Sequence, residues 1–371
     1  MRNPKFRALA FGVATAVLRP GAAGTLYLQA EQALKPFPER MTDRLQLWAT
    51  TRPERTFMAR RAKLADGTTG NWRHLSYAHA WTQARCIAQA LLNRDLSAER
   101  PVGILSENDL EHALLALGCM IAGVPFVPVS PAYSLVSQDF DKLRHVLRTT
   151  TPGLVFAADG ARYSKAITAA VGSGVEVVLA TGQIDGRSTT TFGCLLSTPA
   201  TELVDAAIQA TDPDTIVKFL FTSGSTRLPS AVINTQRMWC ANQQQMTQSM
   251  PVLLDEPPVL VDWLPWNHTF GGNHNFGLVL FNGGTLYIDD GKPTAALMPE
   301  TLRNLREIAP TVYFNVPTGF EAIANAIKAD NALRRNLLSR VQMFFMQAQH
   351  WPSPCGTACM PQASWRSMNA L

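Results

Sequence analysis

The 371-residue sequence lacks several patterns that would each point to a particular class of protein. No apolar run approaches the roughly 20 residues that a membrane span requires. The formal charge of +5 is spread along the chain, without the cluster of lysine and arginine among aromatic residues that is typical of nucleic-acid binding. We therefore expect no membrane span and no nucleic-acid partner.

Cysteine is scarce, with six residues of which only Cys355 and Cys359 lie near each other. No histidine or further cysteine stands at ligand spacing from that pair, which argues against a zinc site. The other cysteines are typical of buried thiols in a reducing compartment, so we expect a cytoplasmic protein. The basic and apolar start of the chain imitates a secretory signal, but Arg19 and Pro20 interrupt it at once.

The chain does show an alternation of helical and strand-like segments from about residue 40 onward. Residues 76–92 have helical spacing, residues 101–108 predict a buried strand, and residues 109–123 predict a helix capped by Gly123. The alternation continues to a strand at 341–345. This order predicts an α/β fold with mixed, mostly parallel sheets flanked by helices.

We place domain boundaries where the amino-acid composition of the sequence changes. We predict an N-terminal extension at 1–40, a large domain at 41–345 with a subdomain boundary near 182–214, and an aberrant tail at 346–371.

One stretch, FLFTSGSTRLPSAVINTQ, has the composition of a phosphate loop. An apolar strand runs into five hydroxyl or glycine residues, Thr222, Ser223, Gly224, Ser225 and Thr226. Backbone N–H groups in such a turn form a nest for an anion, and the hydroxyls add donors and a ligand for magnesium. An ordinary polar turn has the same composition, and the five residues alone leave both interpretations open.

The stretch resembles the motif T-S-G-S-T-G-x-P-K-G of the adenylate-forming enzymes, the superfamily of AMP-forming acyl-CoA synthetases. Further segments, PVSPAYSLVSQDFDKLRHVL, DWLPWNHTFGGNHNFG, NGGTLYIDDGKP and REIAPTVYFNVP, are similar to feruloyl-CoA synthases within that superfamily. The resemblance covers residues 20–345, with the motifs in the family's order. It implies most of the large N-terminal domain of the adenylate-forming fold.

The resemblance also implies a reaction in two steps. A carboxylate attacks the α-phosphorus of ATP to give an acyl adenylate and pyrophosphate, and the thiol of coenzyme A then displaces AMP. The acid implied is aromatic, a hydroxycinnamate such as ferulate. Phosphoryl transfer of this kind depends on positioning and on charge stabilisation by Mg²⁺ and cationic groups.

The match to the motif assigns roles to the loop and exposes three departures. The five loop residues and Arg227 would bind the phosphates of ATP, and Thr226 would bind Mg²⁺. Arg227 stands where the family has glycine, Ser230 where it has lysine, and Ala231 where it has a second glycine. The loss of lysine removes a phosphate cation, and Arg227 can replace it only with a different reach and geometry. We therefore expect weakened ATP binding.

A second segment, WNHTFGGNHNFG, follows a predicted strand, where α/β sheets collect ligands. A lone histidine is more often a structural residue, but the resemblance implies that His268 is catalytic, beside the acyl pocket and the pantetheine channel. It also implies that Trp266, His268, Phe270 and Gly271 contact the aromatic acid.

The last 26 residues, from Met346 onward, contain no Asp, Glu, Val or Ile and show no helical or strand periodicity. If the codons are read from the third base of the Phe345 codon, the shifted frame permits Tyr-Ala-Gly-Ala-Ala-Leu-Ala, which is similar to the family's continuation. We therefore expect a frameshift near codon 345. The family's Y-G-x-T-E motif and the C-terminal domain with its adenylation lysine cannot be found in the sequence, so we expect this chain to be inactive.

Three alternatives remain beside an active ligase. The chain could be a non-catalytic remnant that binds an aryl acid or a nucleotide, or the product of a pseudogene. A hydrolase would use Ser223 or Ser225 as the nucleophile and His268 as the base, but the sequence has no G-x-S-x-G elbow and no evident acidic partner.

Overall fold

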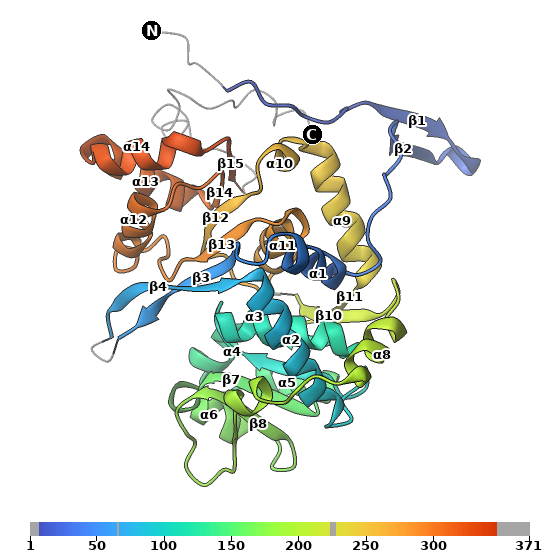
Figure 1. The fold of residues 1–371 in the computed structure, drawn as a ribbon, viewed down its shortest axis with the longest axis vertical. Helices are drawn as coiled ribbons and strands as arrows, with labels where there is room; N and C mark the ends of the chain where they lie inside the picture. Colours follow the sequence, from blue (N-terminus) through green and yellow to red (C-terminus); the bar gives the residue numbers. More distant parts are fainter. Residues whose placement is uncertain (1–6, 65–66, 223–227, 347–371) are drawn as a thin grey trace.

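The computed structural model describes residues 7–64, 67–222 and 228–346. Its largest sheet has the strand order β11, β10, β6, β5, β7, β8, β9 (Figure 1). These strands are β5 (Val102–Leu105), β6 (Phe126–Pro128), β7 (Leu154–Asp159), β8 (Glu176–Thr181), β9 (Thr190–Thr191), β10 (Ile216–Phe221) and β11 (Ala231–Thr235). All neighbours are parallel except β10 and β11.

Helices bury both faces of this sheet. They are α2 (Tyr77–Leu92), α3 (Leu110–Ala122), α4 (Pro131–Leu135), α5 (Asp141–Thr150), α6 (Gly160–Ala170), α7 (Phe192–Leu196) and α8 (Glu202–Ala210). In β7, Leu154 and Phe156 join a core with α2 and α3, whereas Val155 and Ala157 join a second core with α5 and α6. Because successive side chains point to opposite faces, a strand buried on both sides has a continuous apolar sequence, as β7 does.

A second sheet of four strands has the order β12, β13, β3, β4. Its strands are β3 (Thr56–Lys63), β4 (Thr69–Ser76), β12 (Val259–Asp262) and β13 (Thr285–Ile288). β12, β13 and β3 run parallel, and β4 is antiparallel to β3. The helices near it are α1 (Met41–Thr51), α9 (Gln236–Ser249), α10 (Val252–Asp255) and α11 (Phe276–Asn282).

A third layer packs beyond β12 (Figure 1). It contains α12 (Met298–Glu307), β14 (Val312–Asn315), α13 (Pro317–Ala329), α14 (Asn331–Arg340) and β15 (Met343–Met346), with β14 and β15 parallel. Tyr313, Phe320 and Phe344 form its core with Val261 of β12. This core couples the layer to the four-stranded sheet.

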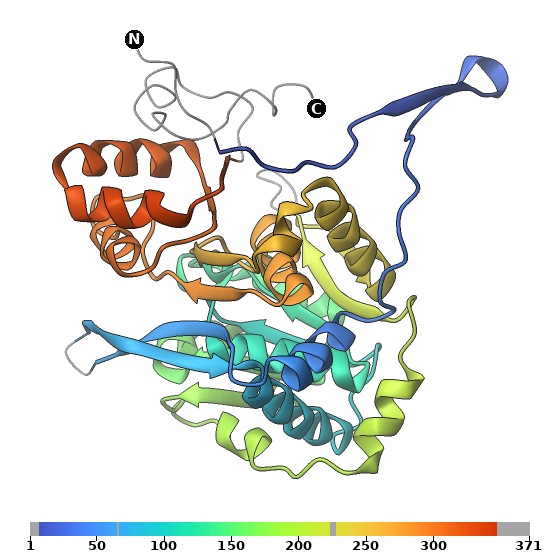
Figure 2. The same ribbon diagram turned by 45° about the horizontal axis from the view of Figure 1, so that its top comes forward.

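Near the N-terminus a hairpin of β1 (Ala16–Pro20) and β2 (Leu26–Ala30), joined by η1 (Ala22–Gly24), projects away from the other elements (Figure 2). Every residue of β2 is exposed. The hairpin contributes nothing to the cores of the described chain.

The predicted α/β fold is confirmed, and several elements fall where the sequence places them. The helix at 109–123 is α3, and Gly123 caps it with φ +69°, in the left-handed region that glycine favours. Residues 182–214 contain β9, α7 and α8 and connect β8 to β10 of the same sheet. The subdomain boundary there stays a prediction, as do the other predicted boundaries.

Candidate active site

The predicted phosphate loop connects β10 to β11. Thr222 N donates to the carbonyl oxygen of Ser230 at 3.0 Å, and Ser230 N donates to Thr222 Oγ1, also at 3.0 Å. These two bonds close the base of the loop. Thr222 and Ser230 are both exposed. Ser223, Gly224, Ser225, Thr226 and Arg227 lie outside the described residues, and their predicted roles, including that of Ser223 or Ser225 as a nucleophile, stay predictions.

His268 follows β12 on an exposed turn before the π-helix η2 (Phe270–Asn275). The ring nitrogen Nδ1 of His268 accepts a hydrogen bond from the backbone N–H of Phe270 at 3.3 Å. The backbone N–H of His268 donates to the carbonyl oxygen of Pro265 at 3.1 Å. The backbone thus fixes the turn and one ring nitrogen, which leaves Nε2 as the atom that could meet a substrate. The catalytic role of His268 stays a prediction.

The other three residues predicted to contact the acid are buried. Trp266 packs edge to face on Phe276, with ring centroids 5.2 Å apart, and Phe270 packs in the same way on Phe314 at 5.8 Å. At Gly271, an added Cβ would lie 2.4 Å from the carbonyl oxygens of Leu264 and Pro265. Glycine is therefore needed at 271 for a close approach of two backbone segments. These three residues are thus part of the buried structure next to the exposed turn that carries His268, and none of them lines the cleft described below.

A cleft of about 970 Å³ opens at the carboxyl ends of strands from both sheets. Ser106 and Glu107 follow β5, Ser130 follows β6, Asn267 follows β12 and Lys292 follows β13. Ligands of open α/β sheets bind at this end of the strands. His268 does not line the cleft, but its neighbour Asn267 does.

Asn108 joins the two sheets at the floor of the cleft. Its Nδ2 donates to the carbonyl oxygen of Leu264 at 2.9 Å, and its Oδ1 accepts from Trp266 N at 3.0 Å. Both bonds reach the backbone of the segment that carries His268. A single amide side chain after β5 therefore positions the predicted substrate segment against the larger sheet.

Two cations at the cleft share one carboxylate. Arg162 and Lys292 both lie 3.1 Å from Glu107, one at each carboxylate oxygen. Burial alone would raise the pKa of Glu107, but the two cations hold this pKa below its usual value. Guanidinium and ammonium groups are the donors that proteins use for phosphate, so this side of the cleft suits an anionic ligand.

Two buried carboxyl groups support the other side of the cleft. Burial raises the pKa of Asp262 to about 7, although its carboxylate accepts hydrogen bonds from Asn275 Nδ2 and Leu264 N. Burial also raises the pKa of Asp289, which accepts from Thr301 Oγ1 at 2.6 Å and from Gly291 N at 2.8 Å. Asp289 thereby fixes the chain where it leaves β13 and enters the cleft.

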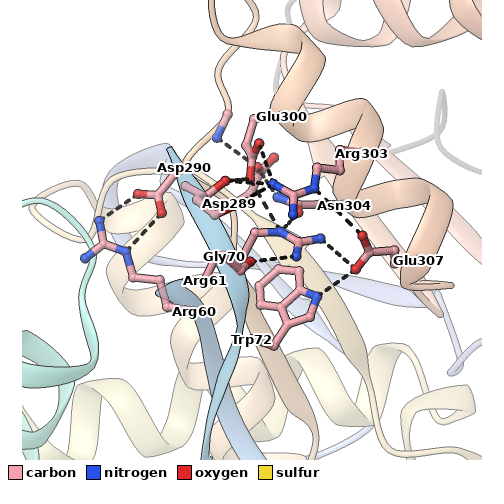
Figure 3. Close-up of polar contacts among 12 residues, drawn as sticks. Arg60, Arg61, Gly70, Trp72, Asp289, Asp290, Glu300, Arg303, Asn304 and Glu307 are labelled. Carbon is pink, nitrogen blue, oxygen red and sulfur yellow. Dashed lines mark hydrogen bonds and ion pairs between the residues drawn. The ribbon is translucent and has the colours of Figure 1, made fainter. Parts of the chain in front are cut away.

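A polar network behind the cleft holds β3 and β4 to α12 (Figure 3). Arg61 donates to Glu307 at 2.6 Å and to Asn304 at 2.7 Å, and its guanidinium stacks on Trp72, 4.3 Å from the ring centroid. Trp72 in turn donates to Glu307 at 3.1 Å. This network was not predicted from the sequence. Its signal was a pair of arginines that follow the apolar residues Phe57–Ala59 in one strand.

Within residues 7–64, 67–222 and 228–346, no three His, Cys, Asp or Glu side chains are grouped closely enough to hold a metal ion. No helix in the same ranges combines the length and the apolar character needed to cross a membrane.

Comparisons with known proteins agree with this architecture. Residues 45–371 match the model of the AMP-binding enzyme family. A 3-[(3aS,4S,7aS)-7a-methyl-1,5-dioxo-octahydro-1H-inden-4-yl]propanoyl:CoA ligase of Rhodococcus jostii (strain RHA1) is 26% identical over 271 residues, which are 70% of this chain and 50% of that protein. The chain thus spans half the length of this curated relative.

Two solved structures share the fold. One, from a study of fatty acyl-adenylate ligases of E. coli and L. pneumophila, has a TM-score of 0.66 at 20% identity and covers 87% of this chain and 55% of its own. The other, the anthranilate CoA ligase AuaEII in complex with anthranoyl-AMP, has a TM-score of 0.65 at 15% identity and covers 87% of this chain and 58% of its own. Together with the family match, which extends over most of the sequence, these findings show that the chain belongs to the AMP-binding enzyme family.

Proposed function

We propose that this chain provides the large N-terminal domain of an acid-CoA ligase. The reaction consumes ATP and a carboxylic acid, releases pyrophosphate, and transfers the acyl group from AMP to the thiol of coenzyme A. The observation that carries the proposal is the family match over 45–371, which includes the loop between β10 and β11 and the cleft at the strand ends. Since the chain spans only part of its relatives, the activity of the whole protein is part of the proposal.

The residue roles follow the motif. Thr222, Ser223, Gly224, Ser225, Thr226 and Arg227 bind the phosphates of ATP, and Thr226 binds Mg²⁺. When bound, ATP with Mg²⁺ supplies the electrophilic phosphorus and the leaving pyrophosphate. Of these loop residues the structure describes Thr222, whose backbone N–H and hydroxyl are both used to close the loop. By the same match, His268 would lie beside the acyl group, where its Nε2 would meet the substrate.

The acid that we propose is aromatic, a hydroxycinnamate such as ferulate. Support comes from the aromatic wall of Trp266 and Phe270 and from the fold shared with a ligase that holds anthranoyl-AMP, the adenylate of an aromatic acid. We also propose a cytoplasmic location, because Cys119 and Cys240 are free and buried thiols, as in proteins of reducing compartments.

The test measures pyrophosphate release from ATP by the purified 371-residue chain in the presence of Mg²⁺ and ferulate, with mass spectrometry of the acyl adenylate. The double variant Arg227→Gly/Ser230→Lys restores the family's glycine and lysine. We expect it to bind ATP about 10- to 100-fold more tightly, the usual effect of a charge-assisted hydrogen bond. If neither chain binds ATP or ferulate, the proposed function is wrong.

A second candidate is a binding remnant that retains the acid site without catalysis. Ser230 favours it, because this exposed serine stands where the family has a phosphate-binding lysine. Calorimetry separates the two candidates: a remnant binds ferulate but releases no pyrophosphate when ATP is added, and the double variant does not change that result.

A further inference from the structure

Lys218 is a lysine of β10 buried among aromatic rings. Its side chain is 1% exposed, and its Nζ lies 3.5 Å from the ring centroid of Trp239 and 5.6 Å from that of Phe126. The amine donates one hydrogen bond, to the carbonyl oxygen of Gly272 at 3.3 Å. Among the residues that the structure describes, no carboxylate forms an ion pair with Lys218. Two of the three donors of an ammonium group are thus unused.

A cavity of about 20 Å³ adjoins this amine, with room for one water-sized group. Trp266 and Gly272 line the cavity together with Lys218. The indole Nε1 of Trp266 is buried and has no hydrogen-bond partner. An indole N–H without a partner and an amine with only one hydrogen bond therefore line one small cavity, and a buried donor without a partner costs stability. The group that would satisfy both is an acceptor oxygen.

The cavity lies directly behind the segment that we assign to the acid. Trp266 is one of the aromatic residues of the proposed acid site, and Gly272 belongs to the π-helix η2. An added Cβ at Gly272 would lie 2.2 Å from the carbonyl oxygen of Trp266, so the backbone at Gly272 passes close to the backbone of Trp266. Short π-helical segments such as η2 occur frequently at functional sites.

We propose that this cavity binds a phenolic hydroxyl on the ring of the aromatic acid. This inference rests on the proposed function. The phenol oxygen accepts hydrogen bonds from Lys218 Nζ and Trp266 Nε1. Where Lys218 is neutral, the phenol proton passes to Nζ, so that a phenolate oxygen faces an ammonium group and no further reactant is needed. A site built around a hydroxyl rejects an analogue that lacks it, because its own donors then stay unpaired.

The test compares 4-hydroxycinnamate with cinnamate, which differ only by this hydroxyl. Calorimetric titration of the purified chain should give about 10- to 100-fold tighter binding of 4-hydroxycinnamate, as expected for a hydrogen bond to a charged group. Lys218→Met should abolish this preference by weakening the binding of 4-hydroxycinnamate alone. Lys165→Met, the same substitution at an exposed position of α6, should leave the preference unchanged.

A spectroscopic measurement adds an independent readout. The absorbance of bound 4-hydroxycinnamate should shift toward that of its phenolate in the wild-type chain and not in Lys218→Met. Trp266→Phe removes the second donor and keeps an aromatic ring, so it should reduce the preference without abolishing it.

The outcomes separate this inference from the function on which it rests. Equal binding of both acids by the wild-type chain, or an unchanged preference in Lys218→Met, overturns the hydroxyl subsite and leaves the ligase proposal intact. If the chain binds neither acid, both proposals are wrong.

Discussion

Arg60 and Lys218 are both buried side chains on strands that can carry a positive charge, but they differ in their partners. Arg60 lies 2.5 Å from Asp109 and 2.6 Å from Asp290. Burial alone would lower its pKa, but the two carboxylates raise this pKa above the usual value of arginine. Lys218 has no carboxylate partner, and burial lowers its pKa well below the usual value of lysine. A paired cation holds segments together, whereas an unpaired one has donors left for a ligand.

The largest effect is expected when the paired cation is removed. Arg60→Met leaves Asp109 and Asp290 close together and partly buried, and should lower the free energy of unfolding by about 3–5 kcal/mol. Urea denaturation measures this loss. Arg144→Met on α5 removes a more exposed pair with Asp141 and should cost under about 1 kcal/mol. If the two variants lose the same stability, the distinction between buried and surface pairs fails here.

The same substitution at the unpaired cation should have the opposite sign. Burial of the Lys218 amine costs desolvation free energy that no ion pair offsets. Lys218→Met removes this cost and should raise the free energy of unfolding by about 1–3 kcal/mol at neutral pH. A loss of stability as large as that of Arg60→Met would contradict the contrast between the two sites.

The pH dependence sharpens this prediction. Because the folded state holds Lys218 with a lowered pKa, the unfolded chain binds more protons between that pKa and about 10.4. In that range the stability of the wild-type chain should therefore rise with pH relative to Lys218→Met, by up to about 1.4 kcal/mol per unit. His112, which faces Lys218, adds no slope there because burial lowers its pKa to about 4. A constant difference would show that folding leaves Lys218 charged.

The smallest effect on stability is expected at the cleft. Glu107→Gln breaks two partly exposed pairs with Arg162 and Lys292 and should cost about 0–1 kcal/mol. It also frees both cations, so calorimetry should show tighter binding of inorganic pyrophosphate. Unchanged pyrophosphate binding would mean that these cations do not serve an anionic ligand.

The sequence predicts elements better than it predicts sites. Gly123 marks the end of α3 because a left-handed cap needs glycine, which is a local property of the chain. The cleft could not be predicted, since Glu107 and Lys292 meet only when two separate sheets are packed. Lys218 was missed because a single lysine in the apolar strand Ile216–Phe221 resembles an exposed edge residue until its surroundings are known.

The hydrogen bonds that close the loop between β10 and β11 have a consequence for protein engineering. Both atoms that Ser230 contributes, its N and its carbonyl oxygen, belong to the backbone, and the strands beyond it are in fixed register from Phe221 and Ala231 onward. Side chains in the loop, other than that of Thr222, whose hydroxyl accepts one of the two bonds, can therefore be exchanged between two anchored ends without rebuilding the scaffold. The loop is in effect a replaceable cassette, into which the phosphate-binding sequences of related enzymes can be grafted one after another.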